Sequence, residues 1–355
     1  SRGLGDVYKR QVIYYIKNKT LVRKFMIYGG SVLNTTKKLT KAALLSSLFI
    51  VVTIIAVSTG FGYAIYLDFI VPVFFCIICL KCDLKYTILS GITSLLIISL
   101  VLGNLGTAIW ASQSVLLGIM CGYLINKPTM VMDDLVYGSV FGVIVMVFID
   151  IYASTLIGYS FMKEFQGYSK WIYFNGYTNF IYYLMIALFP FGMVFCIYLL
   201  SLILGNKLHI LDSNSLKKFL IFKNFRNLNQ FLCCSKKAFY ICVSYLAIFE
   251  VLKLLNVKVN SVYLKTIFIS ITYISLYFII RDSCMSLQNF IIAKFRKLLY
   301  ARILFLIIIL LLFFIFDVTV ISLIIINAFL NKKINIRLSQ SLSLIHISEP
   351  TRRRG

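Results

Sequence analysis

Long apolar stretches recur along this chain and are separated by short polar segments. An α-helix needs about 20 apolar residues to cross the hydrocarbon core of a bilayer, and most of these stretches approach or exceed that length. They lie at residues 42–60, 65–80, 86–103, 106–125, 134–158, 178–205, 238–256, 262–280 and 302–330, with a weaker one at 284–293. The pattern predicts an all-α polytopic integral membrane protein with about eight to nine transmembrane helices.

The chain is expected to divide into three membrane-associated parts. Residues 33–205 contain six of the apolar stretches and should form a six-helix membrane bundle. Residues 206–237 are polar and basic, and residues 238–341 contain the remaining apolar stretches. The stretch 302–330 is too long for one straight crossing and too short for two. Because Asp317 lies near its middle, we expect a bent or broken helix there.

The basic linker, residues 206–237, repeats phenylalanine at every third position over part of its length. Phe219, Phe222 and Phe225 share this spacing, and basic residues are frequent around them. The pattern indicates an amphipathic helix with its apolar face on the membrane and its basic face toward anionic lipid headgroups.

The two ends of the chain do not resemble protein-coding sequence that belongs to the rest. Residues 1–11 and 342–355 resemble translated sequencing-adapter sequence, and we interpret them as artefacts that take no part in the fold. Residues 12–32 have two readings. They are either an untranslated leader, with Gly29-Gly30 encoded by an in-frame ribosome-binding site, or coding sequence that starts at Met26 or further upstream.

Lysine and arginine gather in alternate polar segments, which predicts the orientation of the chain. The segment before the first apolar stretch and the basic linker are rich in lysine, whereas the segments 58–67 and 103–106 have none. Basic loops stay on the cytoplasmic side. We therefore expect a cytoplasmic N-terminus, a cytoplasmic linker and an outward-facing loop at 159–179.

Composition narrows the class of partner. A formal net charge of +24 alone would suit nucleic acid, but 60% of the residues are hydrophobic and the apolar stretches have membrane length. The expected partner is the lipid bilayer and not nucleic acid. The heavy use of Ile, Lys, Asn, Phe and Tyr is typical of an AT-rich bacterial genome, so the predicted location is the bacterial cytoplasmic (inner) membrane.

The sequence carries no signature of an enzyme or of a cofactor site. Neither a glycine–lysine phosphate loop nor a GxSxG nucleophile motif occurs. The run Cys76-x-x-Cys79-x-x-Cys82 offers three thiols where structural zinc needs four ligands, and His209 is the only histidine outside the adapter-like ends. We expect no catalysis, no cofactor and no metal.

Four residues are candidates for contact with a small-molecule ligand. Asp150 lies deep in an apolar stretch, where an ionisable side chain is costly and therefore a functional candidate. The aromatic loop 159–179, which contains Trp171, could close over an outward-facing pocket lined by Trp110, Gln113 and Asp150. The alternatives are structural: a carboxyl group bonded to a neighbouring helix, and an aromatic belt at the membrane interface.

Other charged residues in or near apolar stretches have simpler readings. Glu250 and Lys253 are one helical turn apart and should pair. Arg281 and Asp282 are expected to mark the end of a membrane span.

Small residues recur at helical spacing in several of the predicted helices. This spacing lets two helices approach closely in lipid, either inside the bundle or against another membrane subunit. In the first helix the small residues are a candidate contact with a partner helix, and they are Ala42, Ala43, Ser46 and Ser47. Gly118 with Gly122, and Gly138 with Gly142, repeat the device further along the chain.

Several short segments resemble one family of bacterial membrane proteins. They are Lys38-Leu-Thr-Lys-Ala-Ala-Leu-Leu-Ser-Ser-Leu48, Asp68-Phe-Ile-Val-Pro72, Lys81-Cys-Asp-Leu-Lys85-Tyr86 and Ile334-Asn-Ile-Arg337. Over residues 33–338 the chain resembles the YybS-like family, whose function is unknown. The first six helices of that family are similar to the substrate-binding subunits of energy-coupling-factor vitamin transporters. In those subunits a first helix rich in small residues meets a transmembrane coupling subunit, and ATPases supply the energy.

Two functions follow as expectations. The first, implied by the resemblance, is a binding or transport subunit that recognises an unknown small molecule and depends on a coupling subunit and ATPases. The second is a non-enzymatic structural or scaffolding protein of the bacterial envelope. The half of the chain after the basic linker has no counterpart in the compact vitamin-binding subunits.

Overall fold

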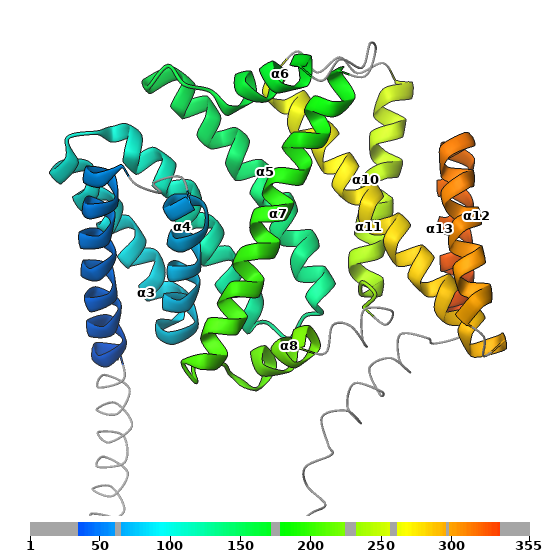
Figure 1. Ribbon diagram of the computed structural model, residues 1–355, viewed down its shortest axis with the longest axis horizontal. Coiled ribbons are helices and arrows are strands. Elements are labelled where there is room, and N and C mark those ends of the chain that lie inside the picture. Colours follow the sequence, from blue (N-terminus) through cyan, green and yellow to red (C-terminus); the bar gives the residue numbers. More distant parts are fainter. Residues whose placement is uncertain are drawn as a thin grey trace, which may run out of the picture.

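The computed structural model describes residues 35–60, 65–171, 178–223, 232–255, 261–295 and 298–333. All regular secondary structure within them is helical, which confirms the all-α prediction (Figure 1). Five of these helices are long and apolar enough to cross a membrane: Thr35–Thr59, Leu105–Asn126, Val131–Leu156, Thr178–Lys207 and Val262–Ile292. Leu299–Phe314 and Phe316–Asn331 are shorter and apolar. The chain is a polytopic membrane protein, and a total of eight to nine crossings stays a prediction.

The helices follow one another along the chain in this order. The first helix is Thr35–Thr59. After it come η1 (Tyr66–Ile70), α3 (Val71–Leu102), α4 (Leu105–Asn126), α5 (Val131–Leu156), α6 (Phe161–Trp171), α7 (Thr178–Lys207), α8 (Ser213–Lys223), α10 (Lys236–Leu254), α11 (Val262–Phe295), α12 (Leu298–Phe314) and α13 (Phe316–Lys333). The short helices α6 and α8 lie at opposite ends of the bundle formed by the longer ones (Figure 1).

Helix α3 is two helices joined at a break. Asp83 has φ 71° and ψ 160°, which no α-helix contains, so a first half ends at Cys82 and a second half starts at Leu84. The break falls between the apolar stretches 65–80 and 86–103, where the sequence predicts a turn. The Asp83 carboxylate forms an ion pair with Lys38, which ties the break to the start of the first helix.

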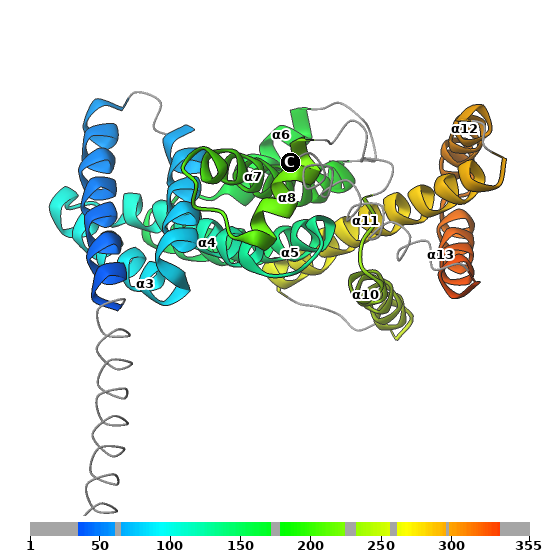
Figure 2. The same cartoon turned by 90° about the horizontal axis from the view of Figure 1, so that it is seen from below.

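Glycines set the close packing of the bundle. A Cβ atom on Gly118 of α4 would lie 2.3 Å from the carbonyl oxygen of Pro72, and one on Gly122 would lie 2.6 Å from Cβ of Cys79. Helix α4 therefore touches the first half of α3 almost backbone to backbone. Figure 2 shows these helices side by side. The first glycine pair packs inside the chain.

The second glycine pair has the same role between α5 and α7. A Cβ atom on Gly138 would lie 2.7 Å from Val194, and one on Gly142 would lie 3.0 Å from Pro190. For both pairs the structure confirms the reading of internal bundle packing. These contacts place α4 between α3 and α5, and α5 against α7, around a shared apolar core.

Helix α11 is longer than the apolar stretch 262–280 from which it was predicted. Helix α11 continues without interruption over 34 residues, and Asp282 within it is fully buried. The weaker apolar stretch 284–293 extends the same helix, so Arg281 and Asp282 do not end the helix. That they mark the end of the membrane span stays a prediction. Helix α11 slants from the bundle to the pair α12 and α13, which stand side by side (Figure 1). The break at Ile315 confirms the broken helix predicted within 302–330.

Candidate functional site

Asp150 anchors the start of α6. One carboxylate oxygen accepts the hydroxyl of Ser160 at 2.8 Å, and the other accepts the backbone N–H groups of Phe161 at 2.6 Å and Met162 at 3.4 Å. The first N–H groups of a helix have no partner within it, and the helix dipole favours a negative charge there. Asp150, fully buried on α5, therefore holds α6 over the end of the bundle.

An aromatic cluster lies around this anchor. The ring of Phe161 lies 4.4 Å from Trp110 of α4 and 6.4 Å from Phe165, centroid to centroid. Tyr159 lies 5.4 Å from Trp110, and Phe189 of α7 lies 5.8 Å from Phe165. The two pairs with Trp110 are edge-to-face, and aromatic pairs contribute about 0.5–1.5 kcal/mol each beyond area burial. The rings fasten α6 to α4 and α7.

Gln113 lies one helical turn below Trp110 on α4 and is 5% exposed. Its Oε1 atom has no hydrogen-bond partner. Leaving a buried acceptor unpaired costs about 1–3 kcal/mol. Gly106, seven residues before Gln113, faces Ile157 just after α5, and Leu117, four residues after Gln113, faces Gly142 of α5. Helical spacing therefore puts Gln113 on the side of α4 that packs against α5.

The structure thus gathers three of the four predicted ligand residues at the α6 end of the bundle. Trp110 contacts the first residue of α6, Asp150 binds the backbone of that residue, and Gln113 lies one helical turn from Trp110 on the same side of α4. The side chain of the fourth, Trp171, lies outside the described part of the chain. Asp150 has a structural partner, whereas Gln113 carries the unpaired group.

The small residues of the first helix divide into two sets. Ala42 and Ser46 are 1% and 6% exposed and pack within the chain, beside the cluster around Phe49. Ala43 and Ser47 are exposed. The expectation of partner contact is corrected for Ala42 and Ser46, because their own bundle covers them. It stays a prediction for Ala43 and Ser47.

Sequence reasoning missed a buried ion pair at the α8 end of the bundle. Lys218 of α8 is 3% exposed, and its Nζ atom lies 2.6 Å from Oδ2 of Asp134 in the first turn of α5. The same carboxylate accepts hydrogen bonds from Tyr198 of α7, at 2.6 Å, and from Thr129. Lys218 also donates to the carbonyl oxygen of Leu124 at 2.7 Å. One lysine therefore joins α8 to α4, α5 and α7.

This ion pair corrects part of the linker prediction. Within the described residues the linker is helical from Ser213 to Lys223, and Phe219 and Phe222 pack against the core instead of lying on lipid. Phe225 lies outside the described residues. Burial lowers the pKa of the Lys218 ammonium, and the Asp134 carboxylate opposes that shift. The ion pair could have been suspected from the sequence, because Asp133 and Asp134 lie together at the start of an apolar run in a chain with only 12 acidic residues.

A second set of contacts fixes the end of the linker. The backbone N–H of Cys234 donates to Asp282 at 2.6 Å, and that of Ser235 donates to Asp133 at 2.7 Å. Arg281 donates to the carbonyl oxygen of Leu232 at 3.0 Å. Burial raises the pKa of the Cys234 thiol well above its usual value. These residues hold the segment 232–235 between α5 and α11.

Asp282 also binds α13. Its second carboxylate oxygen accepts Nδ2 of Asn327 at 3.1 Å, and Asn331 donates to the side-chain oxygen of Asn327 at 2.9 Å. Polar ladders of this kind hold transmembrane helices together where lipid offers no hydrogen bonds. Asp282 is therefore a structural tie between α11, α13 and the linker.

The thiols and carboxylates make no metal centre in the part of the chain that is described. No three ligating groups come together there in a way that could hold a metal ion. Cys76, Cys79 and Cys82 are each buried as free thiols against neighbouring helices.

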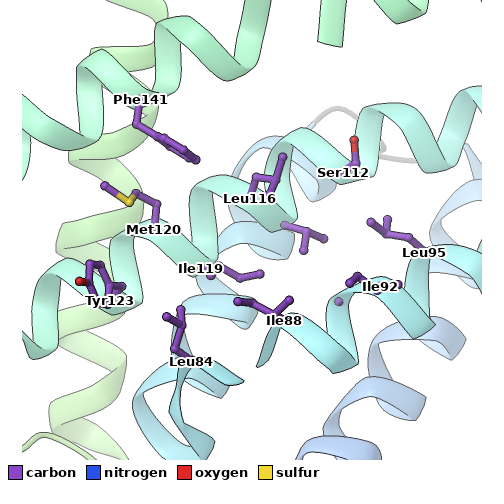
Figure 3. A pocket seen from close by; sticks show the side chains of 12 residues that line it. Leu84, Ile88, Ile92, Leu95, Ser112, Leu116, Ile119, Met120, Tyr123 and Phe141 are labelled. Carbon is purple, nitrogen blue, oxygen red and sulfur yellow. The ribbon is translucent and has the colours of Figure 1, made fainter. Parts of the chain in front are cut away.

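A groove with a volume of about 410 Å³ runs between the second half of α3 and α4. Figure 3 shows apolar side chains from both helices turned toward it. We define this α3–α4 groove by Leu84, Ile88 and Ile92 on α3 and by Leu116, Met120 and Tyr123 on α4. Its lining includes neither Asp150 nor a ring of the aromatic cluster.

Residues 47–173 match the profile of a family described as "Predicted membrane protein (DUF2232)". The matched stretch begins in the first helix and ends just after α6, so it contains the Asp150 anchor and the α3–α4 groove. The resemblance to YybS-like membrane proteins is consistent with this match. No curated protein and no solved structure matches the chain.

Proposed function

We propose that the protein is a membrane subunit of the energy-coupling-factor substrate-binding type, which recognises a small molecule at the α6 end of its bundle and relies on partner subunits for energy. The observation that carries the proposal is the unpaired Oε1 atom of Gln113, which is buried on α4 one helical turn from Trp110 of the aromatic cluster. A ligand that donates a hydrogen bond to this atom would recover the free energy that its burial costs.

The arrangement around α6 supports entry from that end. Helix α6 is only 11 residues long and is not itself a membrane span. Asp150 and the rings of Trp110 and Phe161 hold it in place, so its displacement would uncover Gln113 without unfolding a transmembrane helix. The charge bias of the sequence puts this end outside the cell.

The partner surface in this proposal is the exposed pair Ala43 and Ser47. The test is coexpression of the full chain with the coupling subunit and ATPases of an energy-coupling-factor transporter from the same genome. Ala43→Trp should abolish copurification, since a large side chain keeps the partner helix away. Leu48→Trp is the control, because Leu48 is 53% exposed on another side of the helix.

Membranes that contain the same complex should take up one labelled water-soluble vitamin from a panel. Gln113→Leu should reduce this uptake at least tenfold, which corresponds to a loss of about 1.4 kcal/mol of binding free energy. If the unmodified chain neither copurifies with these partners nor supports uptake of any vitamin in the panel, the proposal is overturned.

One observation favours the second candidate, a structural protein of the envelope. Each charged side chain that is buried in the described part of the chain has a hydrogen-bonded partner, as Asp150 has in α6 and Asp282 has in α13. These residues then act as ties between helices. In that case Asp150→Asn would lower the thermal stability of the isolated chain and change nothing else.

A further inference from the structure

The α3–α4 groove accepts only an apolar occupant. Besides Tyr123, Ser112 is the hydroxyl-bearing residue of its lining, and that hydroxyl already donates to the carbonyl oxygen of Ile109 at 2.6 Å. Gly91 contributes no side chain, and a Cβ there would lie 3.0 Å from Val115. Gly91 therefore lets α3 approach α4 closely at the floor of the groove, and the floor is free of polar groups that need a partner.

The groove opens to the surroundings of the bundle. Ile88, Ile92 and Leu116 are 42%, 55% and 41% exposed. Leu116 belongs to α4, which is long and apolar enough to cross a membrane, and Ile88 and Ile92 belong to the apolar second half of α3 that packs against it. The medium that fills the groove is then the bilayer and not water. The occupant is then either a lipid chain or a helix of another protein.

The length of the groove favours a lipid chain over a helix of another protein. From Ser112 to Tyr123 along α4 it covers about 16 Å, at a rise of about 1.5 Å per residue. This is roughly half of the hydrocarbon core, which is about 30 Å thick. A transmembrane helix would need a seam across the whole core, whereas an acyl chain occupies one leaflet. The dimension fits an acyl chain.

One end of the groove is basic. Lys85 follows Leu84 directly, and the ammonium of Lys127 lies 4.2 Å from the centre of the Tyr123 ring. Both lysines are exposed. The nearby acidic side chain, Asp83, is already paired with Lys38. Figure 3 shows Leu84 and Tyr123 at the same end of the groove. This is the α8 end of the bundle, since Lys218 of α8 binds the carbonyl oxygen of Leu124.

We propose that the α3–α4 groove binds one acyl chain of an anionic phospholipid in the leaflet at the α8 end, with the phosphate between Lys85 and Lys127. Lysines at the membrane interface reach toward headgroups, and each contributes on the order of fivefold to the affinity for anionic lipid. The charge bias of the sequence makes this the cytoplasmic leaflet.

The experiment uses the full chain, purified in a neutral detergent and freed of lipid. Phosphatidylglycerol and phosphatidylcholine with identical acyl chains are added in turn, bound lipids are counted by native mass spectrometry, and the melting temperature is recorded. Phosphatidylglycerol should bind and raise the melting temperature, and phosphatidylcholine should do so more weakly. Equal binding of the two lipids would overturn the preference for an anionic headgroup.

Two pairs of variants locate the site. Ile92→Trp fills the groove and should weaken phosphatidylglycerol binding at least tenfold, whereas Leu96→Trp, at a residue 58% exposed outside the lining, should not. The double variant Lys85→Gln/Lys127→Gln should weaken binding roughly 25-fold, and Lys163→Gln/Lys170→Gln at the α6 end should have no effect.

Retention of the lipid by both Ile92→Trp and the double lysine variant would overturn the proposal. So would a change of oligomeric mass on Ile92→Trp without a change in lipid binding, because the groove would then hold a second copy of the chain. The lysine variants alter only exposed side chains, so they remain informative if Ile92→Trp fails to fold.

Discussion

Lys218 donates a hydrogen bond to Asp134 across 84 positions of sequence, with 2.6 Å between Nζ and Oδ2 and both side chains buried. The pair fixes α8 to the N-terminal turn of α5. Lys218 also donates to one carbonyl oxygen in the last turn of α4, that of Leu124. The stability of the α8 end of the bundle therefore depends on one lysine.

Removal of that lysine should destabilise the chain strongly. Lys218→Met leaves the Asp134 carboxylate buried without its cation, which costs about 3–5 kcal/mol. The melting temperature in detergent measures this. Lys217→Met, at the exposed neighbouring position, is the matched control and should change little. The double variant Asp134→Asn/Lys218→Met should recover part of the loss, and a double variant as unstable as the sum of its single changes would contradict the pairing.

The close approach of α4 and α3 predicts that a methyl group on Gly118 destabilises the chain, whereas one on Gly192 does not. Gly118→Ala places a methyl group 2.3 Å from the carbonyl oxygen of Pro72, so the helices must separate, at a cost of about 1–3 kcal/mol. Gly192→Ala on α7 meets nothing within 4 Å and should be neutral or stabilising by up to about 1 kcal/mol. Thermal unfolding of the two variants side by side tests this. Equal effects would mean that α4 and α3 are not in contact.

The Asp150 anchor predicts a local effect. Asp150→Ala removes the acceptor for the first N–H groups of α6, a loss of about 0.5–2 kcal/mol for a helix cap. Hydrogen exchange should therefore accelerate in residues 161–171 more than elsewhere. Asp150→Asn keeps one amide oxygen as acceptor and should have a smaller effect. Glu250→Gln, which removes an exposed carboxylate, serves as the control for charge. Unchanged exchange in Asp150→Ala would show that α6 is held by its aromatic contacts alone.

The orientation of the chain is testable with introduced cysteines. Lys163 and Ser213 are exposed in α6 and α8, at opposite ends of the bundle. An impermeant maleimide should label Lys163→Cys in intact cells and Ser213→Cys only after permeabilisation. Labelling of Ser213→Cys in intact cells would reverse the orientation.

The native thiols of the linker should give little background in that experiment. Cys233 and Cys234 are buried, and the raised pKa of Cys234 leaves little thiolate to react at neutral pH. The unmodified chain should therefore react with maleimide slowly until it is denatured. This follows from the direction of the pKa shift, because a thiol is less ionised when its pKa rises. Rapid labelling of Cys234 in the folded chain would contradict its burial.

Much of the fold was determined by the sequence alone. The positions of the helices, the break in the segment 302–330 and the turn between 65–80 and 86–103 follow from runs of apolar residues and their interruption by charge. Each is a local property, since the bilayer requires a minimum length of apolar helix whatever the helix packs against. Glycine spacing likewise predicts close helix contacts before any partner is known.

The tertiary structure decided which residue meets which. In the sequence Asp150 is a lone charge within an apolar stretch, but in the structure it accepts a hydrogen bond from the N-terminus of α6. Lys218 reads as one of many basic linker residues, but it is the one that α8 turns inward to Asp134. Arg281 and Asp282 read as a span boundary, but the segment 232–235 and α13 supply their partners within a continuous helix. A buried charge is tolerated only with its partner in place, and partners distant in sequence meet only when the helices pack.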